Sequence, residues 1–403
     1  MDKPTFKRGL LASILSFFLI IGLWLAFRPS AKGLYKTIKP YTFSIVNWEL
    51  SNAPAKWFHE AKNHFQQPAL STDAQKELIG EYLDLASKLN RLEAEGMSAA
   101  GQTSGEVHYR LAQIFRYRLA QISPQVESVL QEQVRTVLIA EGFGQRLPSG
   151  TAFLLPPLSF KMTPAPNILS ISPRETIELK QTFLMDAALD DAQIKTIESN
   201  IEKLGLSAYV ERSGGIATYP SLIPPTENLD SVLSTIAHEW FHQYLFFRPL
   251  GRHYRSTYQM TTINETVANM AGKEIGARSR SLYYGTPDAP GKTGPPVPAF
   301  NFAAAMMEIR GQVDKYLSTG DIEQAEKFME EQRLFLATRG YRLRKLNQAY
   351  LAFHSSYADD PAFSNIIGQQ LRQLRQRSTS LADFVKVVSQ VTTPDGLPRL
   401  LKR

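Results

Sequence analysis

The chain of 403 residues contains no cysteine, so it can form neither a disulfide framework nor a thiol nucleophile, and any bound metal must take nitrogen or oxygen ligands. Nucleic-acid-binding motifs are also absent, and the basic residues behind the net charge of +7 are spread along the chain. We therefore expect no nucleic-acid partner. The charge indicates a solvated basic surface, which could lie near anionic lipid.

Long hydrophobic runs are missing except at the N-terminus, where residues 9–27 form an uncharged run of 19 residues with Trp24 near one end. At about 1.5 Å per residue, such a helix spans most of a hydrocarbon core. No small-x-small cleavage site follows it. We predict a single-pass, uncleaved membrane anchor over residues 1–28 that contacts the lipid bilayer through residues 9–27; a signal peptide is the alternative.

The orientation of this anchor is almost undetermined, because Lys and Arg flank the run on both sides and the positive-inside rule gives little bias. The absence of cysteine removes any hazard of disulfide mispairing outside the cytoplasm. We expect the remainder of the chain to lie outside the cytoplasm. The 43% hydrophobic and 21% charged residues of the full chain are ordinary values, and we expect one or two globular units after the anchor.

The residues His238, Glu239 and His242 form an H-E-x-x-H sequence inside a strongly helical stretch at 228–247. Side chains four apart lie one above the other on a helix, so both imidazoles point from one face with Glu239 beside them. Apolar residues on both sides indicate that this helix is buried. The pattern is half of a zinc site. A hydrogen-bonded histidine pair in a helix core is the alternative.

A second helical stretch begins near Ile263, and its Glu265 lies 23 residues beyond His242. The interval leaves room for the first helix to end, for a loop, and for a return that presents a carboxylate to the same metal. Two histidines and a glutamate with an open fourth position form a catalytic zinc set. We therefore predict one Zn²⁺ bound by His238, His242 and Glu265.

Residues 228–276 resemble the gluzincin metallopeptidases, whose third ligand is a glutamate on the next helix, commonly preceded by asparagine as Glu265 is by Asn264. The downstream half is more loosely similar to predicted bacterial aminopeptidases with this ligand set. Gluzincins often place an aspartate four residues after the glutamate to orient the first histidine. Here Asn269 stands there, which can accept a hydrogen bond without bringing charge. The G-A-M-E-N motif of one aminopeptidase family is absent, so endo- and exopeptidase action both stay open.

Other histidines fit a metal site less well. His253 follows His242 by 11 residues, whereas a metzincin needs its third histidine six residues on, so we interpret His253 as a loop histidine. His59 and His64 are five apart, which turns the second imidazole about 140° away from the first on a helix. We interpret that pair as a decoy.

The region before the H-E-x-x-H helix changes to short runs that predict strands at 153–160, 167–171 and 177–185, followed by a helix from Asp190 to Gly205. Residues 208–211 and 216–219 flank Ser-Gly-Gly and predict a hairpin. In the families that the chain resembles, a strand in that place can pair with an extended substrate. The resemblance therefore implies a peptide-binding edge formed by Ile216, Ala217, Thr218 and Tyr219. An ordinary edge strand is the alternative.

Apolar residues at spacings of three and four predict helices in the remainder of the chain. In the last region, Asn347, Tyr350, His354 and Tyr357 recur at steps of three, four and three. We take Tyr350 and His354 as candidate donors for the oxyanion of peptide hydrolysis; a buried hydrogen-bonding face is the alternative. The helices are expected from Thr72 onward and at 107–122, 124–140, 303–317, 321–337, 343–357, 363–377 and 381–391.

The patterns together predict an α+β, predominantly helical fold with a gluzincin-like catalytic core and a small sheet. In the expected reaction, zinc polarises the carbonyl of a peptide or protein substrate and activates water, while Glu239 accepts the proton and passes it to the leaving amine. The competing interpretation is a non-catalytic, membrane-anchored binding or structural protein with a structural zinc or none. Glu239 separates the two, because a structural site needs no general base. After the anchor, the expected regions are a stalk or linker at 29–70, a helical region at 71–145, a zinc-binding catalytic region at 146–284, a Pro/Gly-rich loop at 285–298 and a C-terminal helical region at 299–403.

Overall fold

The computed structural model describes residues 32–53, 56, 70–98, 103–148, 150–285 and 300–402. The predicted anchor at 9–27 lies outside the described residues, as do 286–298 of the predicted loop and the pair His59 and His64. None of the helices within the described ranges has the length and hydropathy of a membrane span.

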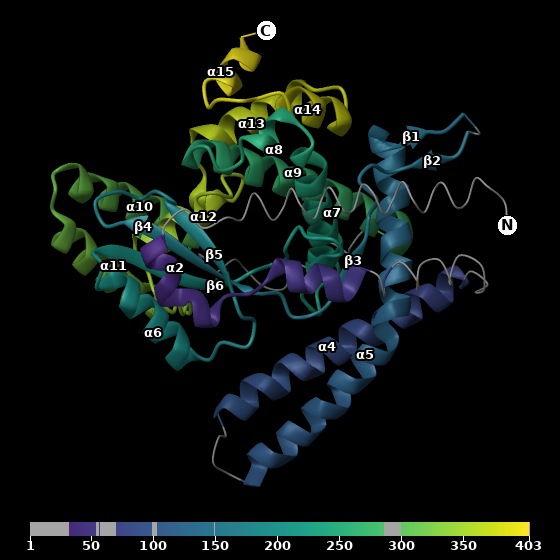
Figure 1. The fold of residues 1–403 in the computed structure, drawn as a ribbon, viewed down its shortest axis with the longest axis horizontal. Coiled ribbons are helices and arrows are strands. Elements are labelled where there is room, and N and C mark those ends of the chain that lie inside the picture. The colour runs from purple at the N-terminus through teal and green to yellow at the C-terminus, as the bar shows by residue number, and fades with distance from the viewer. Residues whose placement is uncertain are drawn as a thin grey trace.

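Helices make up most of the described chain and a few short strands complete it, which confirms the predicted α+β, mainly helical class (Figure 1). The α-helices are α2 Lys32–Ile38, α4 Thr72–Ser98, α5 Thr103–Leu138, α6 Asp191–Glu202, α7 Leu229–Phe246, α8 Pro249–Arg252, α9 Tyr258–Tyr284, α10 Phe302–Ser318, α11 Ile322–Thr338, α12 Gln348–His354, α13 Ile366–Arg377, α14 Leu381–Val388 and α15 Gly396–Leu401. The strands are β1 Gln145–Arg146, β2 Ala152–Phe153, β3 Phe160–Met162, β4 Asn167–Pro173, β5 Gln181–Met185, β6 Leu206–Arg212 and β7 Ser221–Ile223.

The main sheet is antiparallel with the strand order β5-β4-β6. Its apolar face packs on α6, where Ile197 and Ile201 are buried against Leu169 and Val210. The predicted strand at 167–171 is confirmed as part of β4, and that at 177–185 is shortened to β5. The predicted strand at 153–160 is wrong, because the chain there forms β2, a connection and β3, each in a different sheet.

The predicted hairpin at 208–211 and 216–219 is also wrong. Strand β6 pairs with β4, and the next strand, β7, pairs in parallel with β3. Between them the chain makes a single bridge from Ile216 to Leu222. The glycines serve a different purpose from a hairpin turn, since a Cβ on Gly215 would lie 2.4 Å from the Glu239 carboxylate and 2.9 Å from Thr235. The loop therefore lies directly against α7.

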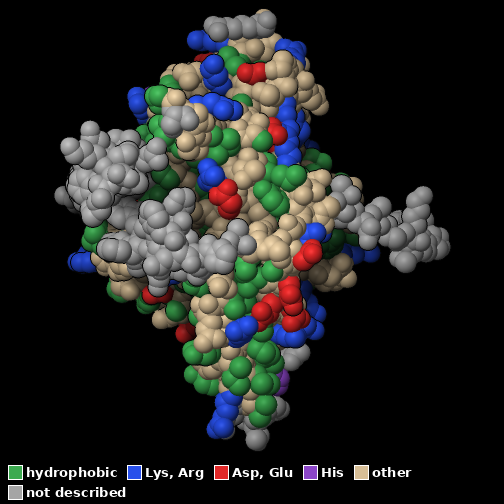
Figure 2. All heavy atoms as spheres, turned by 90° about the vertical axis from the view of Figure 1, so that its right-hand side faces the viewer, with side chains coloured by type: hydrophobic (Ala, Val, Ile, Leu, Met, Phe, Trp, Pro, Cys, Tyr) green, Lys and Arg blue, Asp and Glu red, His purple; other side chains and the backbone are tan. Residues whose placement is uncertain are grey.

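The helical region forms an arm in which α4 and α5 run side by side and project from the body (Figure 1). We expected a break at Pro124, but α5 continues through it because buried side chains on both sides, such as Ile122 and Val126, pack the whole helix. Figure 2 shows hydrophobic side chains along the outer surface of this arm, and Ile114 and Tyr117 on α5 are more than half exposed, at 59% and 67%.

The segment at 32–53 belongs to the predicted stalk or linker, but it packs on the body, and we call it the N-terminal brace. Its Ile38 is buried in the core of the sheet, and Glu49 is fully buried. Phe43 N donates to Leu184 O and Asp186 N donates to Tyr41 O, so the segment covers the C-terminal end of the edge strand β5.

The C-terminal region contains the predicted helices with one large change in length. Helix α12 covers seven residues and begins only at Gln348, because the Asn347 side chain caps it. Helix α15 was not expected. Helices α13 to α15 gather beside α9, while α10 and α11 lie on the far side of the sheet region (Figure 1).

Helices α7 and α9 pack tightly at the centre of the main core, and this contact positions the predicted site. A Cβ on Gly272 of α9 would meet Ser234 O at 2.8 Å and the His238 Cα at 3.0 Å, and one on Gly276 would meet Ser234 N at 2.8 Å. Glycine at both positions therefore allows the backbones of the two helices to approach closely.

Candidate metal centre

Helix α7 is held in place by its other faces, which pack in the hydrophobic core. The Asn228 side chain caps its first turn by accepting from Ser231 N at 2.9 Å. Trp240 and Phe241 are completely buried, and Trp240 also donates from Nε1 to Pro156 O. This anchoring holds the remaining face, with His238 and His242, toward α9.

Both imidazoles and the Glu265 carboxylate converge as the sequence predicted. Nε2 of His238 and Nε2 of His242 are 2.9 Å apart, and Glu265 Oε2 lies 3.7 Å and 3.3 Å from them, respectively. Ligand atoms about 2.0–2.1 Å from a tetrahedral ion are about 3.3 Å apart. The three atoms thus form a triangle of the right size for one face of a tetrahedral metal site.

Glu239 lies in the same group, since it, His238 and His242 offer ligand atoms that are all within 4.8 Å of one another. The residues of this cluster could therefore hold a metal ion. With no sulfur in the donor set, the available ligands are imidazole nitrogen and carboxylate oxygen, which suit zinc and several other divalent metals.

The histidine that receives support from a second residue is His242 and not His238. Asn264 Oδ1 lies 2.9 Å from His242 Nδ1, and a proton on Nδ1 leaves Nε2 free as a ligand. The prediction that Asn269 orients His238 is wrong: no hydrogen bond joins these two side chains within the described part of the chain, and Asn269 Nδ2 donates to both carboxylate oxygens of Asp359, at 2.9 and 3.1 Å. Asp359 comes from the turn after α12, a contact that spacing along α9 could not reveal.

Within the cluster, the pKa values of the two histidines shift in opposite directions, and so do those of the two glutamates. Burial lowers the pKa of His238 to about 3, and neighbouring His242 adds to this shift. Burial also acts to lower the pKa of His242, but Glu265 outweighs it and raises the pKa to about 9. Burial opposes ionisation of Glu265, yet His242 and His238 lower its pKa to about 2. Burial raises the pKa of Glu239 to about 8, with His242 opposing and Glu265 adding to the shift.

These groups line a cavity of about 610 Å³. Its walls come from the loop at Gly215, from β5, from the connection between α8 and α9, and from the end of α12. The predicted substrate-binding segment is split by this arrangement. Ile216 and Ala217 line the cavity, whereas Thr218 and Tyr219 are buried behind it.

The buried half of that segment is held by Glu49 of the N-terminal brace. The Thr218 hydroxyl and Tyr219 N both donate to Glu49 Oε1, at 2.5 and 3.1 Å, and Gln243 Nε2 donates to Thr218 O at 2.6 Å. The prediction that Thr218 and Tyr219 bind substrate is therefore wrong, because their polar groups already serve the fold.

The predicted oxyanion donors Tyr350 and His354 are not at the cavity. The Tyr350 ring is 4% exposed and packs edge-on against Tyr209, with centroids 5.1 Å apart. His354 Nε2 lies 3.5 Å from Glu211 Oε2. The prediction is wrong because α12 ends at His354, so the expected helical face does not continue to Tyr357.

Two tyrosines reach the cavity instead. Tyr254 donates its hydroxyl to Glu265 Oε1, and Tyr357, from the same predicted stripe as Tyr350, lines the cavity beside Glu239. Burial raises the pKa of both hydroxyls well above the ordinary value, and nearby Glu265 adds to this, so both stay protonated at neutral pH. No periodic signal marks Tyr254, which lies in the connection between two helices. His253 beside it donates from Nδ1 to Pro249 O at 2.8 Å and is not among the lining residues.

No family model matches this chain, no curated protein matches it, and no solved structure matches it. Its function has to be argued from the site.

Proposed function

We propose that this protein is a zinc-dependent peptidase of the gluzincin type that hydrolyses a peptide or protein substrate. The observation that carries the proposal is the triangle of ligand atoms from His238, His242 and Glu265, with sides of 2.9, 3.3 and 3.7 Å, beside Glu239 in an open cavity. Three ligands with space for water and substrate are the arrangement of a catalytic zinc site.

Zinc at this triangle would supply a Lewis acid that polarises the scissile carbonyl and lowers the pKa of water. Glu239 is the residue that takes a proton from the attacking water and returns it to the leaving amine. The loop at Gly215 lies against its carboxylate and limits where that carboxylate can go. Asn264 keeps His242 in the tautomer that offers Nε2.

Tyr357 replaces Tyr350 and His354 as the proposed donor to the oxyanion, because the one hydroxyl proton of Tyr254 is already donated to Glu265. Tyr357 lines the cavity, and its hydroxyl is protonated at neutral pH because burial raises its pKa. A protonated phenol at the cavity can stabilise negative charge on a tetrahedral intermediate.

The competing function is a structural zinc site in a non-catalytic binding protein. One observation favours it: the Glu239 ligand atom lies within 4.8 Å of those of both histidines, so Glu239 could close the site as a fourth ligand. A closed site of four protein ligands leaves no position for water.

A paired assay of the wild type and Glu239→Gln separates the two functions. Zinc content, thermal stability and cleavage of an unbiased peptide mixture are measured on the same preparations. If Glu239 is the general base, Glu239→Gln should still bind zinc, and its rate of cleavage should fall by about 10²–10⁴-fold. Zinc-loaded wild type that cleaves nothing, together with weaker zinc binding in Glu239→Gln, would favour the structural site.

Membrane anchoring through residues 9–27, with the catalytic part outside the cytoplasm, is a proposal from the sequence alone. The full chain is expected to stay with membranes after a high-salt wash and to be released by detergent, whereas residues 32–403 should be recovered without detergent. Release of the full chain by salt would contradict an anchor.

A further inference from the structure

Three cationic side chains, Lys180, Arg252 and Arg255, line the cavity beside the metal centre. Among the described lining residues, the only acids are Glu178 and the two glutamates of the centre itself, Glu239 and Glu265. With a divalent cation bound, the cavity as a whole carries an excess of positive charge.

Arg255 is the cation with a direct link to the metal centre. It follows Tyr254, whose hydroxyl donates to Glu265, and its charge interacts with that of Glu265. Its own Nη2 lies 3.4 Å from the Thr182 hydroxyl on β5. The guanidinium thus reaches from the α8–α9 connection to the strand that forms the opposite wall.

Strand β5 is an edge strand of the main sheet, and its residue Thr182 contacts this guanidinium. The bonds from Phe43 N to Leu184 O and from Asp186 N to Tyr41 O show that the even-numbered residues of β5 turn their backbone groups outward. By the alternation of a strand, Thr182 does the same at the end that Phe43 leaves uncovered. An extended peptide paired there would run alongside Arg255.

We propose that the cavity selects peptides that carry a carboxylate close to the scissile bond, and that Arg255 binds this carboxylate. Lys180 and Arg252 add to the attraction. A guanidinium forms charge-assisted, often bidentate hydrogen bonds with a carboxylate, and a cleft lined by one sign of charge concentrates ligands of the opposite sign. The inference rests on the proposed peptidase function, and it names the substrate class of the same site.

The carboxylate can come from an Asp or Glu side chain or from the free C-terminus of the substrate. Three matched peptide mixtures distinguish these sources: one unmodified, one amidated at the C-terminus, and one with Asn and Gln in place of Asp and Glu. They are digested by the zinc-loaded full chain. We expect the mixture that lacks the recognised carboxylate to be cleaved with a kcat/KM at least about tenfold lower, the size of a lost charge-assisted hydrogen bond.

The variant that tests the residue assignment is Arg255→Gln, with Arg339→Gln as the matched control. Arg339 is an exposed arginine after α11 and does not line the cavity. Arg255→Gln should abolish the difference between the mixtures while zinc content stays near the wild-type value. Arg255→Lys, which keeps the charge, should retain part of the preference, and Arg339→Gln should retain all of it.

The outcomes separate this inference from the function on which it rests. Active wild type that cleaves all three mixtures equally would overturn the inference and leave the peptidase standing. A full preference in folded, zinc-loaded Arg255→Gln would also overturn it. Zinc-loaded wild type that cleaves none of the mixtures would overturn the peptidase, and the inference with it.

Discussion

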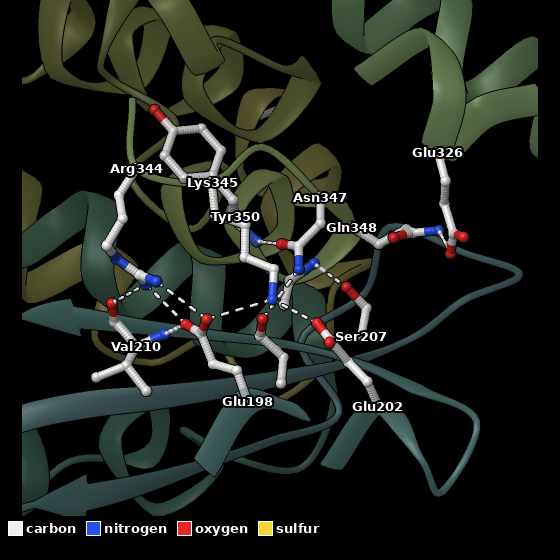
Figure 3. Close-up of polar contacts among 12 residues, drawn as sticks. Glu198, Glu202, Ser207, Val210, Glu326, Arg344, Lys345, Asn347, Gln348 and Tyr350 are labelled. Atoms are coloured by element: carbon white, nitrogen blue, oxygen red, sulfur yellow. Dashed lines mark hydrogen bonds and ion pairs between the residues drawn. The ribbon is translucent and has the colours of Figure 1, made fainter. Parts of the chain in front are cut away.

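Two buried polar clusters in this protein are built from similar residues in opposite ways. The metal cluster joins α7 and α9 and opens onto the cavity; it consists of His238, Glu239, His242 and Glu265. The Glu198 cluster joins α6, β6 and the segment before α12 (Figure 3); it consists of Glu198, Arg344, Lys345 and the backbone of Val210.

The Glu198 cluster is satisfied by its own members. Both Glu198 oxygens accept hydrogen bonds from Arg344, at 3.0 and 2.7 Å, and they also accept from Val210 N at 2.8 Å and Lys345 Nζ at 3.3 Å. Opposite charges face each other, so the cluster needs no ligand. Such a group contributes to the fold by fixing α6 to β6 and to the C-terminal region.

The metal cluster differs in how strongly its members are shifted and in facing a cavity. At neutral pH, pKa values of about 9 for His242 and about 2 for Glu265 leave these two groups charged and paired, while His238 at about 3 and Glu239 at about 8 stay uncharged. Strongly perturbed groups that gather at a cavity are typical of functional sites. The comparison shows that burial and charge alone do not mark a site; strongly shifted pKa values at an open cavity do.

The largest expected effect is the stabilisation of the metal cluster by zinc. A ligand present at 1,000 times its Kd stabilises the folded state by about 4 kcal/mol. Removal of zinc by a chelator should therefore lower the melting temperature of the wild type markedly. The variant with His238, His242 and Glu265 all replaced by alanine should bind no stoichiometric zinc and should not respond to the chelator. Stoichiometric zinc in that variant would show that the metal lies elsewhere.

The next effect concerns how closely the two helices of the metal cluster approach. Gly272→Ala places a Cβ 2.8 Å from Ser234 O and 3.0 Å from the His238 Cα, and overpacking of this kind costs about 1–3 kcal/mol of stability. It should also weaken zinc binding, because it moves His238 relative to Glu265. Gly311→Ala is the matched control. No atom lies within 4 Å of its added Cβ, so it should stabilise α10 by about 0.5–1 kcal/mol. Denaturant unfolding and zinc titration of both variants measure the difference.

A matched pair of Glu→Gln replacements tests the two clusters directly in the metal-free protein. Glu198→Gln removes the charge that faces Arg344 and Lys345 and should lower the free energy of unfolding by about 1–3 kcal/mol, toward the smaller value because both cations are partly exposed. Glu239→Gln should change the free energy of unfolding little. Burial raises the pKa of this carboxyl to about 8, so it is already uncharged at neutral pH, and glutamine has the same shape. Equal losses in the two variants would mean that the clusters do not differ as argued.

The metal cluster could be predicted from the sequence to a greater extent than its surroundings. The positions of His238 and His242 depend on the local repeat of a helix, and Glu265 follows from a helix that returns after a short connection. By contrast, Glu49 meets Thr218 across 169 residues, and Asp359 meets Asn269 across 90. Pairings at such separations leave no periodic trace in one sequence.

Two of the wrong predictions near the site concern where an element ends or where the chain turns. The prediction that Tyr350 and His354 are oxyanion donors assumed a helix from 343 to 357. Helix α12 stops at His354, so Tyr357 lines the cavity while Tyr350 stays in the core. The hairpin prediction assumed that Gly215 forms a turn. Instead, the absence of a side chain at Gly215 allows the loop to contact Glu239.

The smallest expected effect compares two asparagines five residues apart on α9 that the sequence alone cannot rank. Asn264 Oδ1 contacts His242 Nδ1 at 2.9 Å, whereas Asn269 Nδ2 donates to Asp359 and stays outside the metal cluster. Loss of a partner that orients a ligand typically weakens metal binding by about 10–100-fold, and we expect about the lower value because helix packing also holds His242. Asn264→Ala should therefore raise the Kd for zinc about tenfold, and Asn269→Ala should leave it within about twofold. Competition with a chelator of known affinity measures both, and thermal stability without zinc serves as the control for folding. A larger effect of Asn269→Ala on affinity would contradict this ranking. It would mean that Asp359 acts on His238 through a contact other than the hydrogen bonds of the described residues. Asn269 and Asp359 would then belong to the metal cluster and not to the polar groups that only support the fold.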